Sequence, residues 1–146
     1  MKKTIIFFSI LFFITGNALA AGSSSGDTKS NFDQAVKLIK SAKKSEQKGK
    51  KDKAQSNYEK AFKLLIKSNE KKPNQADTLN YLGFTSRKLG DYENGENYYL
   101  QGLAINPKHK GINEYLGELY VATNRHNLAV ERPVSYTHLT LPTMFE

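Results

Sequence analysis

The chain has 146 residues, of which 38% are hydrophobic and 25% are charged, and its formal net charge is +8. This length allows one domain at most, and the high charge favours an exposed architecture without a thick core. The chain contains no cysteine, which excludes disulfides, thiol catalysis and cysteine-based metal sites.

The amino terminus has the pattern of a secretory signal peptide. A positive start, Lys2 and Lys3, precedes an almost wholly apolar run over residues 4–15, and small residues lead up to Ala20. The apolar run is shorter than the ~20 residues that a membrane-spanning helix needs. We therefore expect residues 1–20 to be cleaved after Ala20 and the protein to be exported, in a bacterium to the periplasm. The alternative is an uncleaved inner-membrane anchor.

A first helical hairpin is predicted over residues 31–73, after a small and polar stretch, residues 21–30, that we expect to be a flexible linker. Both helices of this hairpin show an apolar stripe at helical spacing. The stripes consist of Phe32, Ala35, Val36, Leu38, Ile39 and Ala42, and of Ala54, Tyr58, Ala61, Phe62, Leu65 and Ile66.

Two alignments of this hairpin with the later chain compete. Anchoring on Pro73 makes Gly49 the counterpart of Gly83, whereas anchoring on the hairpin turn makes it the counterpart of Gly90. We prefer the second alignment, since it places glycine where a helix stops and leaves the charged run 48–53 at an exposed corner. It requires a second helix about two turns longer than is usual for a repeated hairpin of this kind, reaching Glu70.

Residues 74–107 form the clearest unit. Leucines recur at helical spacing up to Leu89, Gly90 interrupts them, and a tyrosine-rich helix follows until Pro107 ends it. Three glycines fall inside these helices, at a cost of ~1 kcal/mol each relative to alanine. We therefore expect the helix backbones to approach closely there, with aromatic rings on the flanks. The glycines are Gly83, Gly95 and Gly102.

The unit recurs in part over residues 108–132. The matching pairs, each 34 residues apart, are Leu82 and Leu116, Gly83 and Gly117, and Gly95 and Ala129. With this period, residues 74–107 resemble a tetratricopeptide repeat (TPR). The resemblance implies an all-α, TPR-type α-solenoid of about three antiparallel helix hairpins, the last one truncated. Its packing residues would be Leu79, Leu82, Gly83, Gly95, Tyr99, Gly102, Pro107, Leu116, Gly117, Tyr120 and Ala129.

Residues 133–146 break the pattern, because Pro133 falls where a helix should continue. Residues 134–143, VSYTHLTLPT, resemble the translation of a transposase sequencing adapter. We therefore interpret residues 133–146 as a non-native tail and expect the natural protein to be longer. The alternative is an ordinary strand-like tail.

The resemblance also implies a function, because the first helices of TPRs line a concave groove that binds an extended or helical peptide. We therefore expect a scaffold with a protein or peptide partner. Asn80 would hold a peptide backbone, and Phe84 would be an apolar anchor. Arg87 and Lys88 would meet an acidic group. The groove residues, transferred by position, are Asp77, Asn80, Phe84, Arg87, Lys88, Glu114, Glu118 and Val121, with Ile39, Lys43, Glu46 and Gln47 from the first hairpin.

The positive charge is concentrated in the first hairpin, where residues 29–72 hold 14 lysines and five acidic residues, a net charge of +9. A solvated lysine-rich face is the plain interpretation. The alternative function is a tether to an anionic envelope surface, either lipid head groups or cell-wall polymer. We expect no nucleic acid partner, since lysine lacks the bidentate fork of arginine.

We predict no enzyme, cofactor or metal site. His109 and His126 lack metal-ligand spacing. Glu114 and Glu118 have a spacing that suits acid–base chemistry, but such pairs are common on helix surfaces. A further alternative is that the chain is a fragment of a larger multidomain envelope protein.

Overall fold

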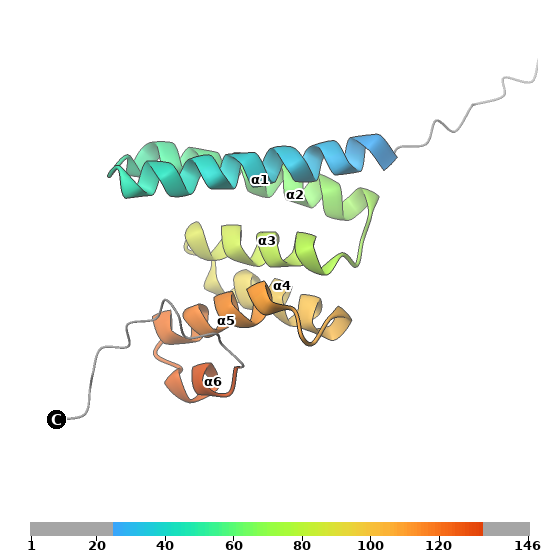
Figure 1. The fold of residues 1–146 in the computed structure, drawn as a ribbon. Coiled ribbons are helices and arrows are strands. Elements are labelled where there is room, and N and C mark those ends of the chain that lie inside the picture. The colour runs from blue at the N-terminus through green and yellow to red at the C-terminus, as the bar shows by residue number, and fades with distance from the viewer. Residues whose placement is uncertain (1–24, 133–146) are drawn as a thin grey trace, which may run out of the picture.

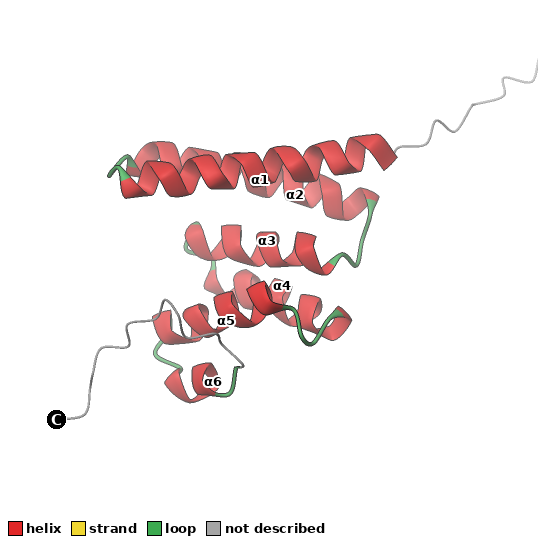
Figure 2. Ribbon diagram, viewed as in Figure 1, coloured by secondary structure: helices red, strands yellow, loops and turns green. Residues whose placement is uncertain are grey.

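The computed structural model describes residues 25–132 of the chain. Within these residues every regular element is a helix, and short loops join the helices (Figure 2). The helices are α1 (Ser25–Gln47), α2 (Lys51–Lys71), α3 (Ala76–Lys88), α4 (Tyr92–Ile105), α5 (Lys110–Ala122) and α6 (His126–Val130). The predicted signal peptide (residues 1–20) and the predicted non-native tail (residues 133–146) lie outside the described residues.

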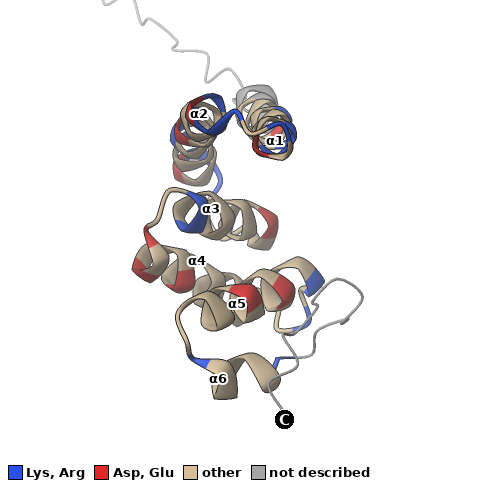
Figure 3. Cartoon of the chain, turned by 90° about the vertical axis from the view of Figure 1, so that its left-hand side faces the viewer, with Lys and Arg blue, Asp and Glu red and all other residues tan. Residues whose placement is uncertain are grey.

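The helices form antiparallel hairpins that stack on one another (Figure 1). Seen along the helices, α1, α3 and α5 follow one another on one side of the stack, while α2 and α4 lie on the other side (Figure 3). Helix α3 contacts both α1 and α5. This arrangement confirms the predicted all-α, TPR-type solenoid. No helix within residues 25–132 is both long enough and apolar enough to cross a membrane.

Gly49 and Gly90 hold the same place in their hairpins. Both have positive φ values, 70° and 88°, and both lie in the turn between two helices. Gly83, in contrast, is buried inside α3. The structure therefore supports the alignment on the hairpin turn. Helix α2 has 21 residues and α4 has 14, and this difference is the expected extra length of about two turns.

Helix α1 begins at Ser25, earlier than we predicted, so residues 25–30 are helical rather than a linker. These residues contain no proline, and once a helix is nucleated each added residue gains a hydrogen bond. Gly26 opposes the extension by only ~1 kcal/mol. The composition that suggested a linker is therefore compatible with an added helical turn.

Two groups of buried side chains hold the stack together. The first joins α1, α2 and α3, and the second joins α4 and α5. Of the predicted packing residues, Pro107 is exposed and Ala129 is half-buried, whereas the others are buried. The buried ones are Leu79, Leu82, Gly83, Gly95, Tyr99, Gly102, Leu116, Gly117 and Tyr120.

The close approach of α3 and α4 takes place at glycines. A Cβ atom added to Gly95 would lie 3.2 Å from the carbonyl oxygen of Gly83, so the two backbones touch there. A Cβ atom added to Gly83 would lie 2.5 Å from Cε1 of Tyr99, whose ring is fully buried. The aromatic ring thus fills the space that a side chain on α3 would need.

Candidate peptide-binding face

The candidate site is the side of the stack formed by α1, α3 and α5, which we call the inner face. All of the predicted groove residues come from these three helices. Charged side chains of these helices contact aromatic rings and one another on this side, and the contacts decide which parts of the face are open.

Phe84 does not form the exposed anchor that we predicted, because its ring is only 2% exposed. The ring lies between Tyr58 of α2 and Tyr115 of α5, with centroid distances of 5.9 Å and 5.0 Å. Lys43 of α1 places Nζ 4.5 Å from the Phe84 ring centroid and donates a hydrogen bond of 3.2 Å to the Tyr115 hydroxyl. This stack joins α1 to α5 across α3 and fills the part of the inner face around Phe84.

The predicted acid-binding cations already have carboxylate partners. Arg87 Nη2 lies 2.6 Å from Glu118 Oε2, and Lys88 Nζ lies 2.9 Å from Glu46 Oε2. Glu46 also accepts a hydrogen bond of 3.0 Å from the Tyr58 hydroxyl. The partners come from neighbouring helices, so these pairs link the hairpins of the described chain. They do not offer an unpaired charge to a ligand.

Asp77 and Asn80 lie near the start of α5. Asp77 Oδ1 is 2.9 Å from Nε2 of His109, and Nδ1 of the same ring accepts a hydrogen bond of 3.1 Å from the Ile112 amide. Because Nδ1 accepts this bond, Nε2 carries an N–H group and donates a hydrogen bond to Asp77. His109 is therefore a helix cap, a role that sequence reasoning missed although its position before α5 was available as a signal. Asn80 is buried beside Gly111, and its Oδ1 accepts no hydrogen bond from the part of the chain that the structure describes.

The remaining predicted residues on α5 are Glu114 and Val121, and both are half-buried. Glu118, the second member of the carboxylate pair considered for acid–base chemistry, is held by Arg87. Within residues 25–132, no group of three or more His, Cys, Asp or Glu side chains is placed to hold a metal ion.

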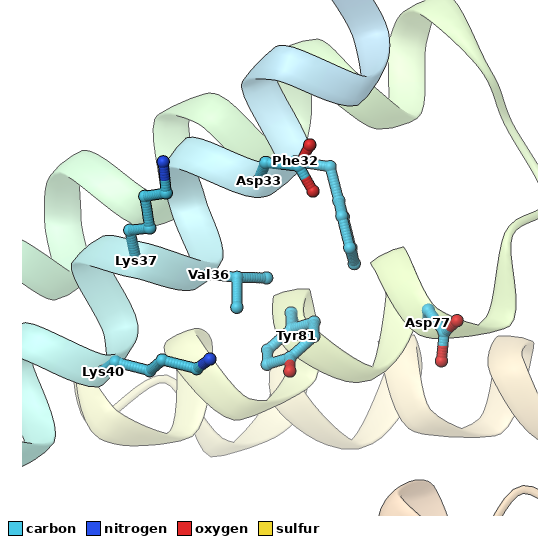
Figure 4. Close-up of a pocket in the computed structure, with 7 residues that line it drawn as sticks. All are labelled: Phe32, Asp33, Val36, Lys37, Lys40, Asp77 and Tyr81. Atoms are coloured by element: carbon cyan, nitrogen blue, oxygen red, sulfur yellow. The ribbon is translucent and has the colours of Figure 1, made fainter.

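The open part of the inner face is a recess of about 450 Å³ between α1 and α3 (Figure 4). Its apolar floor is formed by half-buried side chains, and the rings of Phe32 and Tyr81 meet edge to face with a centroid distance of 5.6 Å. Of the predicted groove residues, Asp77 lines this recess. The lining residues are Phe32, Asp33, Val36, Lys37, Lys40, Asp77 and Tyr81.

The buried tyrosines make stability fall at alkaline pH. Burial raises the pKa of Tyr58, and the hydrogen bond and negative charge of Glu46 raise that pKa further. Burial likewise raises the pKa of Tyr99. In the unfolded chain tyrosine ionises near its ordinary pKa of about 10, so the contribution of these residues is full below that pH and is lost as the pH rises above it. We expect the urea midpoint to drop between pH about 8 and about 11, and to drop less in Tyr58→Phe.

Comparison with known proteins agrees with this architecture. Residues 76–109 match the tetratricopeptide repeat family model, and this span contains α3 and α4. Comparison with curated proteins gives no match. The family match and the stacked hairpins together support a TPR protein with a TPR-type solenoid fold. Because TPRs generally mediate protein–protein interactions, the fold supports a protein-interaction scaffold with a protein partner.

Proposed function

We propose that the protein is a non-catalytic adaptor of the bacterial periplasm that binds a protein or peptide segment on its inner face. The observation that carries this proposal is the recess between α1 and α3, which combines an apolar floor with a charged rim. Interfaces have this anatomy, in which a few buried apolar contacts supply most of the affinity and polar groups surround them. The periplasmic location is supported by the leader pattern of residues 1–20.

The competing surface lies on the other side of the stack. Large apolar side chains on α4 are 41–45% exposed, namely Tyr92, Leu100 and Ile105. They are spread along the helix, from its first residue to its last, and single exposed apolar side chains are normal on protein surfaces. The inner-face recess, in contrast, brings three apolar side chains from two helices together. An experiment can compare these two surfaces directly.

Site-specific photo-crosslinking tests which side binds. Peptides are first selected on the chain from a random display library. Benzoylphenylalanine is then placed at Asp33 and Glu114 on the inner face, and at Lys63 and Gln101 on α2 and α4 as exposed controls. We expect the selected peptides to crosslink to the inner-face positions at least about tenfold more efficiently, as a specific site requires. Equal crosslinking from all four positions, or crosslinking from the controls alone, would overturn the proposal.

Export is tested by the mass of the protein. When the chain is expressed in a Gram-negative bacterium, we expect the periplasmic extract to contain a protein that begins at Ala21. Ala20→Arg should block cleavage, because the peptidase requires a small residue at this position. An uncleaved wild-type chain in the membrane fraction would instead support the inner-membrane anchor.

A second candidate function, the tether to an anionic surface, is favoured by the exposure of the lysines in the first hairpin. From residue 31 to residue 72, Lys43 is half-buried and every other lysine is exposed. The carboxylate of Glu46 is engaged by Lys88 of α3, which leaves less compensating charge on the hairpin. A lysine near an anionic membrane contributes about 1 kcal/mol.

Co-sedimentation distinguishes the two sources of anionic charge. The protein is mixed with phosphatidylglycerol vesicles, with phosphatidylcholine vesicles, or with purified cell-wall polymer, each at low and at high salt. A tether would bind the anionic materials at low salt and release them at high salt, because salt screens exposed charges. Binding that does not respond to salt would reject the tether. Equal binding to both kinds of vesicle would reject lipid head groups as its target, and a lack of salt-sensitive binding to the polymer as well would reject the tether altogether.

A further inference from the structure

The recess between α1 and α3 has a fixed electrostatic direction. Lys37 and Lys40 lie at one end and Asp77 at the other, with the apolar side chains between them (Figure 4). Asp33, Lys37 and Lys40 follow one another along α1 and span ~10 Å at a rise of 1.5 Å per residue. This length corresponds to about three residues of extended chain.

The two ends differ in the contacts that their charged groups already make. Asp77 Oδ1 is hydrogen-bonded to His109 Nε2 at a distance of 2.9 Å. Lys37 and Lys40 are both exposed, and neither has a carboxylate partner within residues 25–132. Nearby on the inner face, Arg87 and Lys88 are paired with glutamates. Asp33 and Asp77 balance the formal charge of the two lysines over the whole lining, but Lys37 and Lys40 lie together at the end away from Asp77, so that end of the recess is positive (Figure 4).

We propose that the recess binds a short extended peptide segment in which a bulky apolar side chain stands next to acidic residues. The apolar side chain packs on Phe32, Val36 and Tyr81, and the acidic residues meet Lys37 and Lys40. This inference rests on the proposed function and specifies the chemistry of the partner. It replaces Phe84, Arg87 and Lys88 as the expected ligand contacts by residues that the structure leaves accessible.

The magnitudes assign different roles to the two kinds of contact. Burying one bulky apolar side chain contributes more to affinity than an exposed ion pair at the rim, because water and salt screen the ion pair. The apolar side chain therefore supplies most of the affinity, and the carboxylates select between acidic and basic partners. A recess of about 450 Å³ falls within the size range of ligand sites and holds one such side chain with its adjoining backbone.

Fluorescence anisotropy with synthetic peptides tests this chemistry on the full chain. The labelled probes carry a central Phe-Asp-Asp or Asp-Asp-Phe between Gly-Ser flanks, and the comparison probes replace either the Asp pair by Lys-Lys or the Phe by Ala. We expect at least one acidic Phe probe to bind about tenfold more tightly than both of its comparison probes. Lys37→Glu with Lys40→Glu should reverse the preference for acidic over basic probes. Lys60→Glu with Lys63→Glu makes the same charge change on α2 and should leave the preference for acidic probes unchanged.

A second variant tests the apolar part without a change of charge. Val36→Trp fills the recess and should weaken the acidic Phe probe by about tenfold, while circular dichroism and the urea midpoint report whether the fold is kept. If Val36→Trp disturbs the fold, the two lysine double variants still decide, because their side chains are exposed. Equal weakening by both lysine double variants would show unspecific charge attraction and would overturn the recess proposal.

The crosslinking experiment separates this inference from the proposed function. Crosslinks from Glu114 without any from Asp33 would leave the inner face as the binding side but remove the recess as the site. Acidic Phe probes that crosslink at Asp33 would support both. If no selected peptide and no probe crosslinks to the inner face, the proposed function fails and this inference fails with it.

Discussion

Gly83→Ala is expected to destabilise the protein by about 2 kcal/mol, although alanine is favoured over glycine inside a helix by about 1 kcal/mol. The added Cβ atom would lie 2.5–2.8 Å from three atoms of the Tyr99 ring. That ring is 0% exposed and cannot swing away, so the backbone of α3 or α4 has to move. Overpacking of this kind costs about 1–3 kcal/mol and occasionally more. Urea unfolding followed by far-ultraviolet circular dichroism measures the change.

Gly102→Ala is the matched control for this prediction. Its Cβ atom would meet Cδ1 of Ile112 at an even shorter distance, but that atom is the end of a flexible side chain and can rotate away. We therefore expect a smaller loss than for Gly83→Ala. In a Tyr99→Leu background, which removes the ring, Gly83→Ala should become neutral or stabilising. A loss of the same size in both backgrounds would show that the ring is not the cause.

The glycine pattern explains why so much of the fold was available from the sequence. Gly83 and Gly95 lie 12 residues apart in the chain, and their small size is unexplained unless two helices fold back and touch. Gly49 and Gly90 are turn residues with positive φ, a conformation that glycine adopts without strain. Local features of this kind depend on the residue itself and its near neighbours. They can therefore be predicted from the sequence.

The contacts on the inner face depend on side chains from distant parts of the chain, and sequence reasoning did not find them. Lys43 and Tyr115 are separated by 72 residues, yet their hydrogen bond helps to enclose Phe84. A groove assigned by position carries no information about which partners the neighbouring helices supply. The recess is a second feature that sequence reasoning did not find. Phe32 packs against the buried core, as its place in the apolar stripe of α1 indicated, but it also lines the open recess with Val36 and Tyr81.

Helix ends also combine local features, which the sequence can indicate, with contacts between distant helices, which it did not indicate. The sequence indicated that α5 begins after Pro107, but it did not indicate that His109 caps this helix through Nδ1 and reaches Asp77 through Nε2. The cap is a local feature of the chain, whereas the pairing with Asp77 requires α3 to lie beside α5. Sequence reasoning was therefore adequate for elements and turns. It was inadequate wherever three helices meet.

Tyr58→Ala is expected to cost about 3–5 kcal/mol, the range for removing a large buried ring. Tyr58 is 1% exposed and its ring contacts Phe84 edge to face. Its hydroxyl donates to Glu46, and Glu46 holds Lys88 of α3. Tyr58 therefore belongs to the contact between the first hairpin and the second. In a stack of repeats stability is a sum of the repeats and their interfaces, so this variant should also loosen the coupling between hairpins.

Native-state hydrogen exchange measures that coupling helix by helix. In Tyr58→Ala, amides of α1 and α2 should exchange at a lower opening free energy than amides of α3 to α5, whereas in the wild-type chain the difference should be smaller. Tyr58→Phe is the control, since it keeps the ring and loses one hydrogen bond, at a cost of about 1.5–3 kcal/mol for a charged acceptor. If all helices of Tyr58→Ala open together, the first hairpin is not held to the rest through this residue. The ring would then stabilise only the hairpin that contains it.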